Sequence, residues 1–208
     1  MPTMSMNKVI HRAVRRDLGR FVEALETFRD GDAERARHLG RAWDNFDAQL
    51  TEHHHGEHEI AWPHLERAGI PRTLLDEMDA EHHVMADALA GARTAMAALR
   101  DEPTSARATE ALEAMRRLQT VTVAHLDHEE SEIEEFYLSH HDHPEIKAMG
   151  REFGKQRPAT AGRFFAWVTD GATPEERASM AVPGPVFAVL NGVWGRGYRK
   201  DVAPVWRS

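Results

Sequence analysis

The 208-residue sequence contains no cysteine, and this absence excludes several kinds of chemistry. Disulfide bonds, thiolate metal sites and cysteine nucleophiles are all ruled out. Any site for a transition metal must therefore be built from histidine, aspartate and glutamate side chains. The sequence also lacks an uninterrupted apolar run of about 18 residues, so no transmembrane helix is expected.

Other features are scarce, and each narrows the class of protein. The first residues, MPTMSMNKVIHR, lack the apolar stretch of a signal peptide, which makes the cytoplasm the expected location. No block rich in Lys and Arg is present and the formal net charge is −8, so nucleic acid is not an expected partner. Strand signals are also rare, because no alternating run of apolar and polar residues exceeds a few positions.

Histidine is the residue in excess, with 14 copies, most of them before residue 84 or between residues 125 and 143. The densest stretch is HHHGEHE at residues 53–59. Such a stretch can be a solvated surface, a loose His-rich tract or part of a metal site. The phase of the helices decides between these interpretations.

Helical periodicity predicts four long helices, over about residues 5–28, 32–66, 71–99 and 105–138. Gly31 and Asp32 are expected to end the first helix and cap the second, and Pro63 is expected to disturb the last turn of the second. Thr104 or Ser105 is the expected N-cap of the fourth helix. Four long helices joined by short turns predict an all-α fold, an up-down-up-down four-helix bundle.

The character of the sequence changes after Pro144. A further helix is expected over residues 145–170, a short one begins at TPEER, and the tail mixes apolar, glycine and basic residues. We expect residues 1–145 to form the bundle and residues 146–208 to form a helical C-terminal extension packed on it. The tail could touch a membrane surface, but a self-packed cap or a homodimer contact is the favoured interpretation.

The core-facing side of each helix follows from spacing alone, because such positions repeat at alternating intervals of three and four in a bundle. In the first helix the series is His11, Val14, Leu18, Phe21 or Val22, and Leu25. In the second it is Trp43, Phe46, Leu50, His53, Glu57 and Ile60. In the third it is Leu75, Met78, His82, Met85, Leu89, Ala92, Met96 and Leu99, and in the fourth Met115, Leu118, Thr122, His125, Glu129, Ile133 and Phe136. Each helix thus has a core-facing histidine, and two helices add a glutamate one turn later.

Six polar residues on core-facing positions predict a metal site. Burying an unpaired polar side chain costs about 2–7 kcal/mol, whereas a whole domain is stable by only about 5–15 kcal/mol. A bound cation removes this cost, because it supplies the countercharge and takes up the lone pairs. Antiparallel helices put all six residues at one end of the bundle, and four imidazoles with two carboxylates suit a pair of ions. The predicted ligands are His11, His53, Glu57, His82, His125 and Glu129.

Most of the remaining histidines are assigned to other roles. His54, His58 and His83 lie off the core-facing side and are expected at the surface or around the ligands. His38 is expected at the surface, and His64 lies a turn beyond the metal level, where a functional role is not favoured. The pairs His55/Glu59, His128/Glu132 and His141/Glu145 are interpreted as solvated faces.

The pattern resembles the hemerythrin-like family, the bundles with an HHE cation-binding signature. The resemblance rests on His11 in IHRAVRRDL, His53 and Glu57 in HHHGEHEIAWP, His82 in AEHHVM, and His125 and Glu129 in HLDHEESEIEEF. In the family the second-helix pair precedes a proline by ten and six residues, as it precedes Pro63 here. The resemblance covers residues 7–140 and implies two non-haem iron ions bridged by two carboxylates and an oxo, hydroxo or water ligand. Family members bind dioxygen, sense oxygen or redox state, handle nitric oxide, decompose peroxide or repair iron–sulfur clusters.

The sequence departs from the oxygen-carrying hemerythrins, which have five histidines, two of them four residues apart on the third helix. Here His82 has Met78 before it and Ala86 after it, so only four core-facing histidines are available. This set resembles that of bacterial members with four histidines and two glutamates, and it implies an open position on one iron. Ferritin-like bundles are the neighbouring alternative, but they need Glu-x-x-His pairs on two helices, and only Glu52/His55 is present.

Three functions stay open at this point. An open metal position favours reaction with small diatomic molecules or peroxide, and peroxide disproportionation needs no external electron donor. The second function is a sensor of oxygen, nitric oxide or redox state, or an iron-binding module without turnover. The third is a structural metal that holds the bundle together. The favoured prediction is small-oxidant chemistry in oxidative or nitrosative stress defence, which includes a catalase-like reaction.

Overall fold

The computed structural model describes residues 3–155, 157–180 and 184–207. Its helices are α1 (Met6–Glu26), α2 (Ala33–Gly56), α3 (Trp62–Ala68), α4 (Arg72–Asp101), α5 (Ser105–Ser139), α6 (Pro144–Phe153), α7 (Pro158–Val168), α8 (Pro174–Ser179), α9 (Gly184–Val189) and α10 (Arg196–Asp201). The other elements are two π-helical turns, η1 (Glu57–Ala61) and η2 (Leu190–Trp194), and a 3-10 turn, η3 (Ala203–Trp206). No strand occurs in these ranges, and none of their helices is long and apolar enough to cross a bilayer. The predicted all-α class is confirmed.

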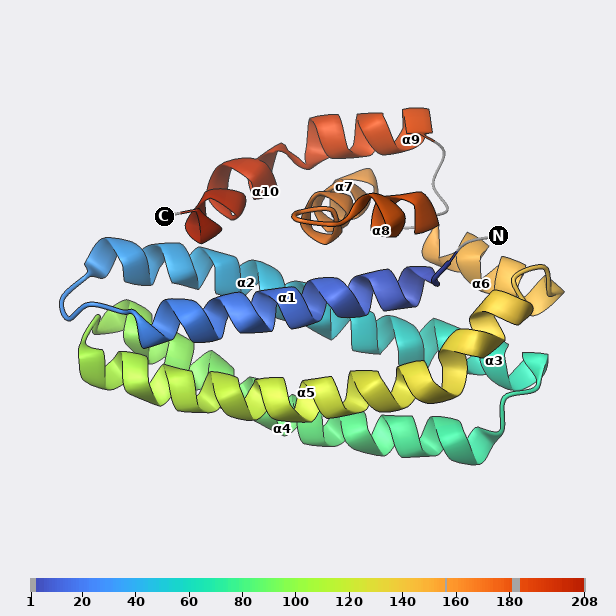
Figure 1. The fold of residues 1–208 in the computed structure, drawn as a ribbon, viewed down its shortest axis with the longest axis horizontal. Coiled ribbons are helices and arrows are strands. Elements are labelled where there is room, and N and C mark those ends of the chain that lie inside the picture. The colour runs from blue at the N-terminus through green and yellow to red at the C-terminus, as the bar shows by residue number, and fades with distance from the viewer. Residues whose placement is uncertain (1–2, 156, 181–183, 208) are drawn as a thin grey trace.

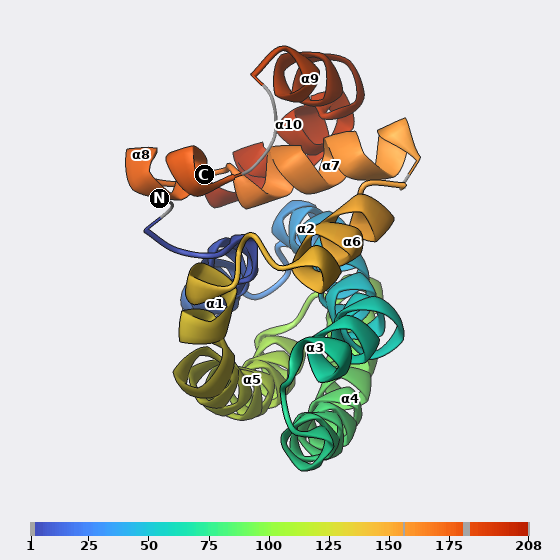
Figure 2. The same cartoon turned by 90° about the vertical axis from the view of Figure 1, so that its right-hand side faces the viewer.

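Four helical segments lie lengthwise and antiparallel in the main body of the molecule: α1, α2 continued by η1 and α3, α4, and α5 (Figure 1). The end view in Figure 2 shows them around a common core. Contacts join α1 to α2, α2 to α4, α4 to α5, and α5 back to α1. This closed ring of antiparallel neighbours is the up-down-up-down bundle that the sequence predicts.

Local signals set the ends of the bundle helices. Ser5, Asp32 and Thr104 are the N-caps of α1, α2 and α5, and each side chain accepts a hydrogen bond from the backbone N–H three residues later. Gly31, in the turn between α1 and α2, has a φ angle of 78°. Glycine adopts this left-handed conformation without the steric cost that a Cβ would bring. The predicted turn and caps are therefore present.

The core is apolar in the half of the bundle that contains the α1–α2 and α4–α5 turns, which we call the apolar half. Phe21, Phe46 and Leu118 are fully buried there. Phe21 meets Trp43 and Phe46 edge-to-face, with ring centroids 5.8 and 5.7 Å apart. Full burial of one such side chain contributes about 1.5–3 kcal/mol, so packing in this half stabilises the fold directly.

The second bundle helix contains a π-helical turn, η1, which changes the helical phase. The backbone N–H of Trp62 bonds to the carbonyl of Glu57, five residues earlier. The prediction that Ile60 faces the core is therefore wrong. Ile60 is only half-buried, whereas Ala61 and Trp62 are buried. Pro63 explains the wider turn: it has no N–H, and its ring would clash with the carbonyl four residues earlier in a regular α-helix.

The extension also departs from one prediction, because the single helix expected over residues 145–170 is two helices, α6 and α7. Gly154 follows the last residue of α6. Arg157 is extended, with ψ of 140°, because the ring of Pro158 excludes the helical conformation from the residue before it. The short helix predicted at TPEER is present as α8, and Thr173 caps it in a capping box.

Helices α7 to α10 form a layer over α1 and α2 (Figure 2). The buried carboxylate of Asp17 accepts a hydrogen bond from the indole Nε1 of Trp167 at 2.8 Å, which joins α1 to α7. The hydroxyl of Tyr198 donates to Oδ2 of Asp170 at 3.0 Å, which joins α10 to the end of α7. Parts of the predicted extension, residues 156, 181–183 and 208, lie outside the described residues. The division of the chain after residue 145 stays a prediction.

Candidate metal centre

The six side chains predicted as metal ligands come from all four bundle segments. They are His11 on α1, His53 on α2, Glu57 on η1, His82 on α4, and His125 and Glu129 on α5. The structure brings them together in the half of the bundle nearer the α3–α4 turn, which we call the polar half. His11, His125 and Glu129 are at most 1% exposed, and Glu57 is 3% exposed. Their role as ligands stays a prediction.

The donor atoms form two groups that share one carboxylate. The groups are His11, His53 and Glu57, and His54, Glu57, His82 and His125, and within each group all donor atoms lie within 4.8 Å of one another. Oε1 of Glu57 is 3.1 Å from Nε2 of His53, and Oε2 is 3.4 Å from Nε2 of His82. One oxygen therefore faces each group, which is how a carboxylate is placed when it bridges two ions in a helical bundle.

Glu129 also lies between the two groups. Its Oε2 is 3.1 Å from Nε2 of His11 and 4.0 Å from Nε2 of His125. Its Oε1 accepts a hydrogen bond from Nδ2 of Asn7 at 2.8 Å. Asn7 thus fixes one carboxylate oxygen and leaves the other facing the histidines.

Within the part of the chain that the structure describes, many of these donor atoms are buried without a partner in hydrogen-bonding geometry. They are Nε2 of His11, His53 and His54, both carboxylate oxygens of Glu57, and Oε2 of Glu129. In addition, the Nε2 atoms of His82 and His125 face each other at 3.0 Å. Each unsatisfied buried polar atom costs about 1–3 kcal/mol, and native proteins keep few of them. Their concentration in one place fits bound cations, which would take up the lone pairs of all these atoms.

The charges in the cluster are strongly coupled. Burial opposes protonation of His11, but the carboxylates of Glu129, Glu130 and Glu57, with Glu129 the largest contributor, together outweigh it and raise the pKa of His11 to about 9. Burial raises the pKa of Glu57 well above its ordinary value, and the charge of Glu129 adds to this shift. Burial lowers the pKa of His53 and of His54 well below the ordinary value. Both imidazoles are therefore neutral near pH 7, and neutral imidazole is the form that binds a metal ion.

Carboxylates outside the cluster orient two of its imidazoles. Nδ1 of His11 is 3.1 Å from Oε1 of Glu130, and Nδ1 of His125 is 2.8 Å from Oε2 of Glu81. Each carboxylate is placed to accept the Nδ1–H proton, which leaves Nε2 facing into the cluster. Metal-binding histidines in proteins are commonly supported in this way.

The position of His54 differs from the sequence prediction, which put it off the core-facing side. Its Nε2 is buried and belongs to the second donor group, and its ring stacks on His82 with centroids 4.4 Å apart. The sequence did carry a signal, because His54 and Glu57 are three residues apart and so are neighbours on one helical face. Asn7 and Glu81 carried no such signal, since their contacts join different helices.

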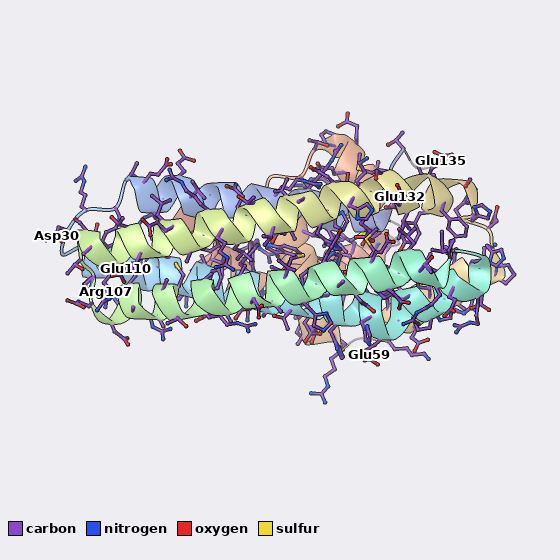
Figure 3. All side chains as sticks on the ribbon, turned by 90° about the horizontal axis from the view of Figure 1, so that it is seen from below. Asp30, Glu59, Arg107, Glu110, Glu132 and Glu135 are labelled. Atoms are coloured by element: carbon purple, nitrogen blue, oxygen red, sulfur yellow. The ribbon has the colours of Figure 1, made fainter. Side chains whose placement is uncertain are left out.

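Several other histidines lie at the surface, as expected. The exposed ones are His55, His58, His83, His140 and His141. Glu59 and Glu132, the predicted partners of His55 and His128, are exposed and point away from the bundle (Figure 3). Helical phase therefore separates His55 and Glu59 correctly from the core-facing His-x-x-x-Glu pairs. His128 and Glu145 are instead half-buried, and they contact Glu81 and His64.

His64 connects the bundle to the extension. Its Nδ1 is 2.7 Å from Oε2 of Glu145, and its Nε2 is 3.3 Å from Oε2 of Glu152, both on α6. The ring of Phe153 on α6 would lie 2.9 Å from a Cβ atom on Gly56, so a side chain at residue 56 has no room. Helix α6 therefore rests directly on the helical turn that precedes Glu57.

Four antiparallel helices around buried imidazoles and carboxylates define a metal-binding helical bundle. The model of one protein family, the hemerythrin HHE cation binding domain, matches residues 7–137, from α1 to near the end of α5. The chain belongs to this family. Comparisons with curated proteins and with solved structures gave no match. The resemblance found in the sequence is confirmed.

Proposed function

We propose that this chain is a non-haem di-iron protein that reacts with or binds small oxidants, namely hydrogen peroxide, nitric oxide or dioxygen. Its role would be oxidative or nitrosative stress defence, with catalase-like peroxide disproportionation as the leading reaction. The observation that carries the proposal is the set of buried, unpartnered donor atoms in two groups that share Glu57. The residues that would hold the ions and their oxo, hydroxo or water bridge are His11, His53, Glu57, His82, His125 and Glu129.

The surroundings of the cluster support a small ligand. Side-chain exposure is 11% for His82 and lower for the other five predicted ligands. This degree of burial favours a diatomic molecule or peroxide over a large substrate. Iron at this position would supply redox chemistry toward these molecules. The chain itself fixes the donors, through Glu130 on His11, Glu81 on His125 and Asn7 on Glu129.

Metal analysis with an absorption spectrum is the first test. We expect two iron ions per chain and an oxo-bridge absorption band. The variants His53→Ala and Glu129→Ala should lower the iron content, and the matched variants His55→Ala and Glu59→Ala, at exposed positions in the same stretch, should not. An iron content unaffected by His53→Ala or Glu129→Ala would contradict the ligand set.

Oxygen evolution after the addition of peroxide tests the reaction. Iron-loaded protein should release oxygen faster than the same amount of free iron. Turnover no faster than that of free iron would exclude the catalase-like reaction and leave the alternative, an oxygen, nitric oxide or redox sensor or an iron-binding module without turnover.

The contact between α6 and the cluster supports that alternative. Because Phe153 packs on Gly56, a change in the turn that carries His53 and Glu57 would reach the extension directly. A sensor should show a reversible optical change with oxygen or nitric oxide, together with altered hydrogen exchange in α6. Irreversible consumption of the added molecule would favour turnover.

A homodimer through the extension is part of the same proposal. Val186, Val189, Val193 and Trp194, on α9 and η2, are 42–54% exposed. Exposed apolar side chains that gather on one segment are typical of interaction surfaces. Light scattering should give twice the chain mass, and Val193→Lys should return the monomer mass; a wild-type monomer would refute the dimer. The cytoplasmic location stays a prediction.

A further inference from the structure

We propose that His54 is a fifth histidine ligand, which binds the same ion as His82 and His125. The inference rests on the proposed function, because it assumes that the cluster holds metal. The helical phase of the sequence does not select His54. The resemblance to oxygen-carrying hemerythrins assigns the additional histidine to the third helix of the bundle, and not to the second.

Position is the first argument. A ring nitrogen of His54 lies within 4.8 Å of donor atoms of Glu57, His82 and His125, and those three also lie within that distance of one another. The ring centroid of His54 is 4.4 Å from that of His82 and 6.1 Å from that of His125. The imidazole therefore lies against the second donor group from the side of α2.

The absence of a hydrogen-bond partner for Nε2 is the second argument. A histidine that only packs in a core normally has its buried ring nitrogens hydrogen-bonded. Nε2 of His54 is buried and has no such partner among the described residues, as is also true of Nε2 of His11 and His53. His54 thus shares this property with two of the predicted ligands, His11 and His53.

The geometry around Glu57 is the third argument. Consecutive residues differ by about 100° around a helix, so His53 and His54 point to different sides of Glu57, at four and three residues from it. Oε1 of Glu57 faces His53 and Oε2 faces the group of His82. The dipeptide therefore supplies one imidazole to each donor group on either side of the shared carboxylate.

The third helix offers no second histidine four residues before or after His82. One turn before it lies Met78, which is buried, and one turn after it lies Ala86, which is exposed. With His54 the second group has three imidazoles, whereas the first has two, His11 and His53. The open position, which would receive the small oxidant, then belongs to the ion on the side of His11 and His53.

Metal titration of the full chain tests this assignment. The probe is Co²⁺, whose visible spectrum reports the ligands, with wild type, His54→Ala and the matched exposed variant His55→Ala. We expect two ions per wild-type chain, and a loss of at least about tenfold in affinity for one ion in His54→Ala, with a changed visible spectrum. His55→Ala should bind like wild type. Wild-type affinity and spectrum in a folded His54→Ala variant would overturn the inference.

A measurement on unmutated protein covers the case in which His54→Ala does not fold. In wild type loaded with Zn²⁺ and labelled with ¹⁵N-histidine, the ring nitrogen of His54 should show the chemical shift of a metal-bound nitrogen. A free-imidazole shift for His54, with two ions bound, would refute the inference and leave the proposed function standing. A wild-type chain that binds no iron, cobalt or zinc would refute both.

Discussion

The two halves of the bundle have the same helical spacing but opposite energetics. In the apolar half, core-facing positions carry side chains such as Phe21, Phe46 and Leu118, whose burial stabilises the fold directly. In the polar half, the next positions of the same series carry histidine and glutamate, and many of their donor atoms are buried without partners. Burial there costs free energy until something binds those atoms.

The difference shows that periodicity and stability are separate properties of a helix. The three-and-four spacing decides which side chains are buried, and the chemistry of the side chain decides the sign of the contribution. At a free metal concentration of about 1,000 times the Kd, metal binding would stabilise the fold by about 4 kcal/mol. The contribution of the apolar half to stability should therefore not change with metal, whereas the contribution of the polar half should depend on bound metal.

Phe46→Ala tests the apolar half and has the largest expected effect on stability. Phe46 is fully buried and contacts Phe21, so truncation should cost about 3–5 kcal/mol. The loss should be the same with and without metal, and iron content per folded chain should not change. Urea unfolding of both forms, with iron analysis, measures this. A loss that differs by more than about 1 kcal/mol between the two forms would show that the halves are coupled.

Glu57→Leu tests the polar half by giving it an apolar residue. The variant should lose metal binding, because the carboxylate shared by the two donor groups is gone. Its metal-free form should be more stable than metal-free wild type by about 1–3 kcal/mol, because two unpartnered buried oxygens are removed. Unfolding of both metal-free proteins measures the difference. Glu59→Leu, at an exposed position two residues later, should change neither property. A metal-free Glu57→Leu less stable than wild type would contradict the energetic contrast.

Much of the bundle could be predicted because its signals are local. Helix ends follow from caps such as Asp32 and Thr104, and the buried face follows from spacing. The phase error at Ile60 arose because a π-helical turn shifts the series by one residue, and periodicity assumes a regular helix. The break between α6 and α7 could have been predicted from Pro158, because proline disfavours the helical conformation in the residue before it.

The candidate site was predictable to a different degree. The six core-facing donors share one property, helical phase, and the structure brings all six together. His54 lies one residue away from the core-facing series of its helix. Its ring still reaches the cluster, where it stacks on the ring of His82 from another helix. Asn7 and Glu81 are set by contacts between helices, which no spacing within one helix encodes.

The pH dependence of metal binding is a smaller test of the polar half. The pKa of His11 is raised to about 9 chiefly by Glu129, against the effect of burial, so metal-free protein carries a proton there at pH 7.5. A metal ion needs the neutral ring and ionised carboxylates, so binding should release at least the His11 proton, and affinity should rise at least about tenfold per pH unit until pH 9. Calorimetry in two buffers of different ionisation enthalpy counts the proton. Heat that does not depend on the buffer would contradict the coupling of His11 to Glu129.

Tyr198→Phe has the smallest expected effect and tests whether the extension belongs with the apolar or the polar half. The Tyr198 hydroxyl is a donor at any working pH, because burial and the neighbouring Asp17 and Asp170 raise its pKa. The Tyr198 hydroxyl is one of two donors to Oδ2 of Asp170, because Arg20 also donates to this oxygen at 3.0 Å. Because Asp170 keeps a partner, removal of the hydroxyl should cost only about 0.5–1.5 kcal/mol by urea unfolding, with iron content unchanged. A loss of iron in this variant would mean that packing of α10 is transmitted to the cluster, and that the polar half includes the extension.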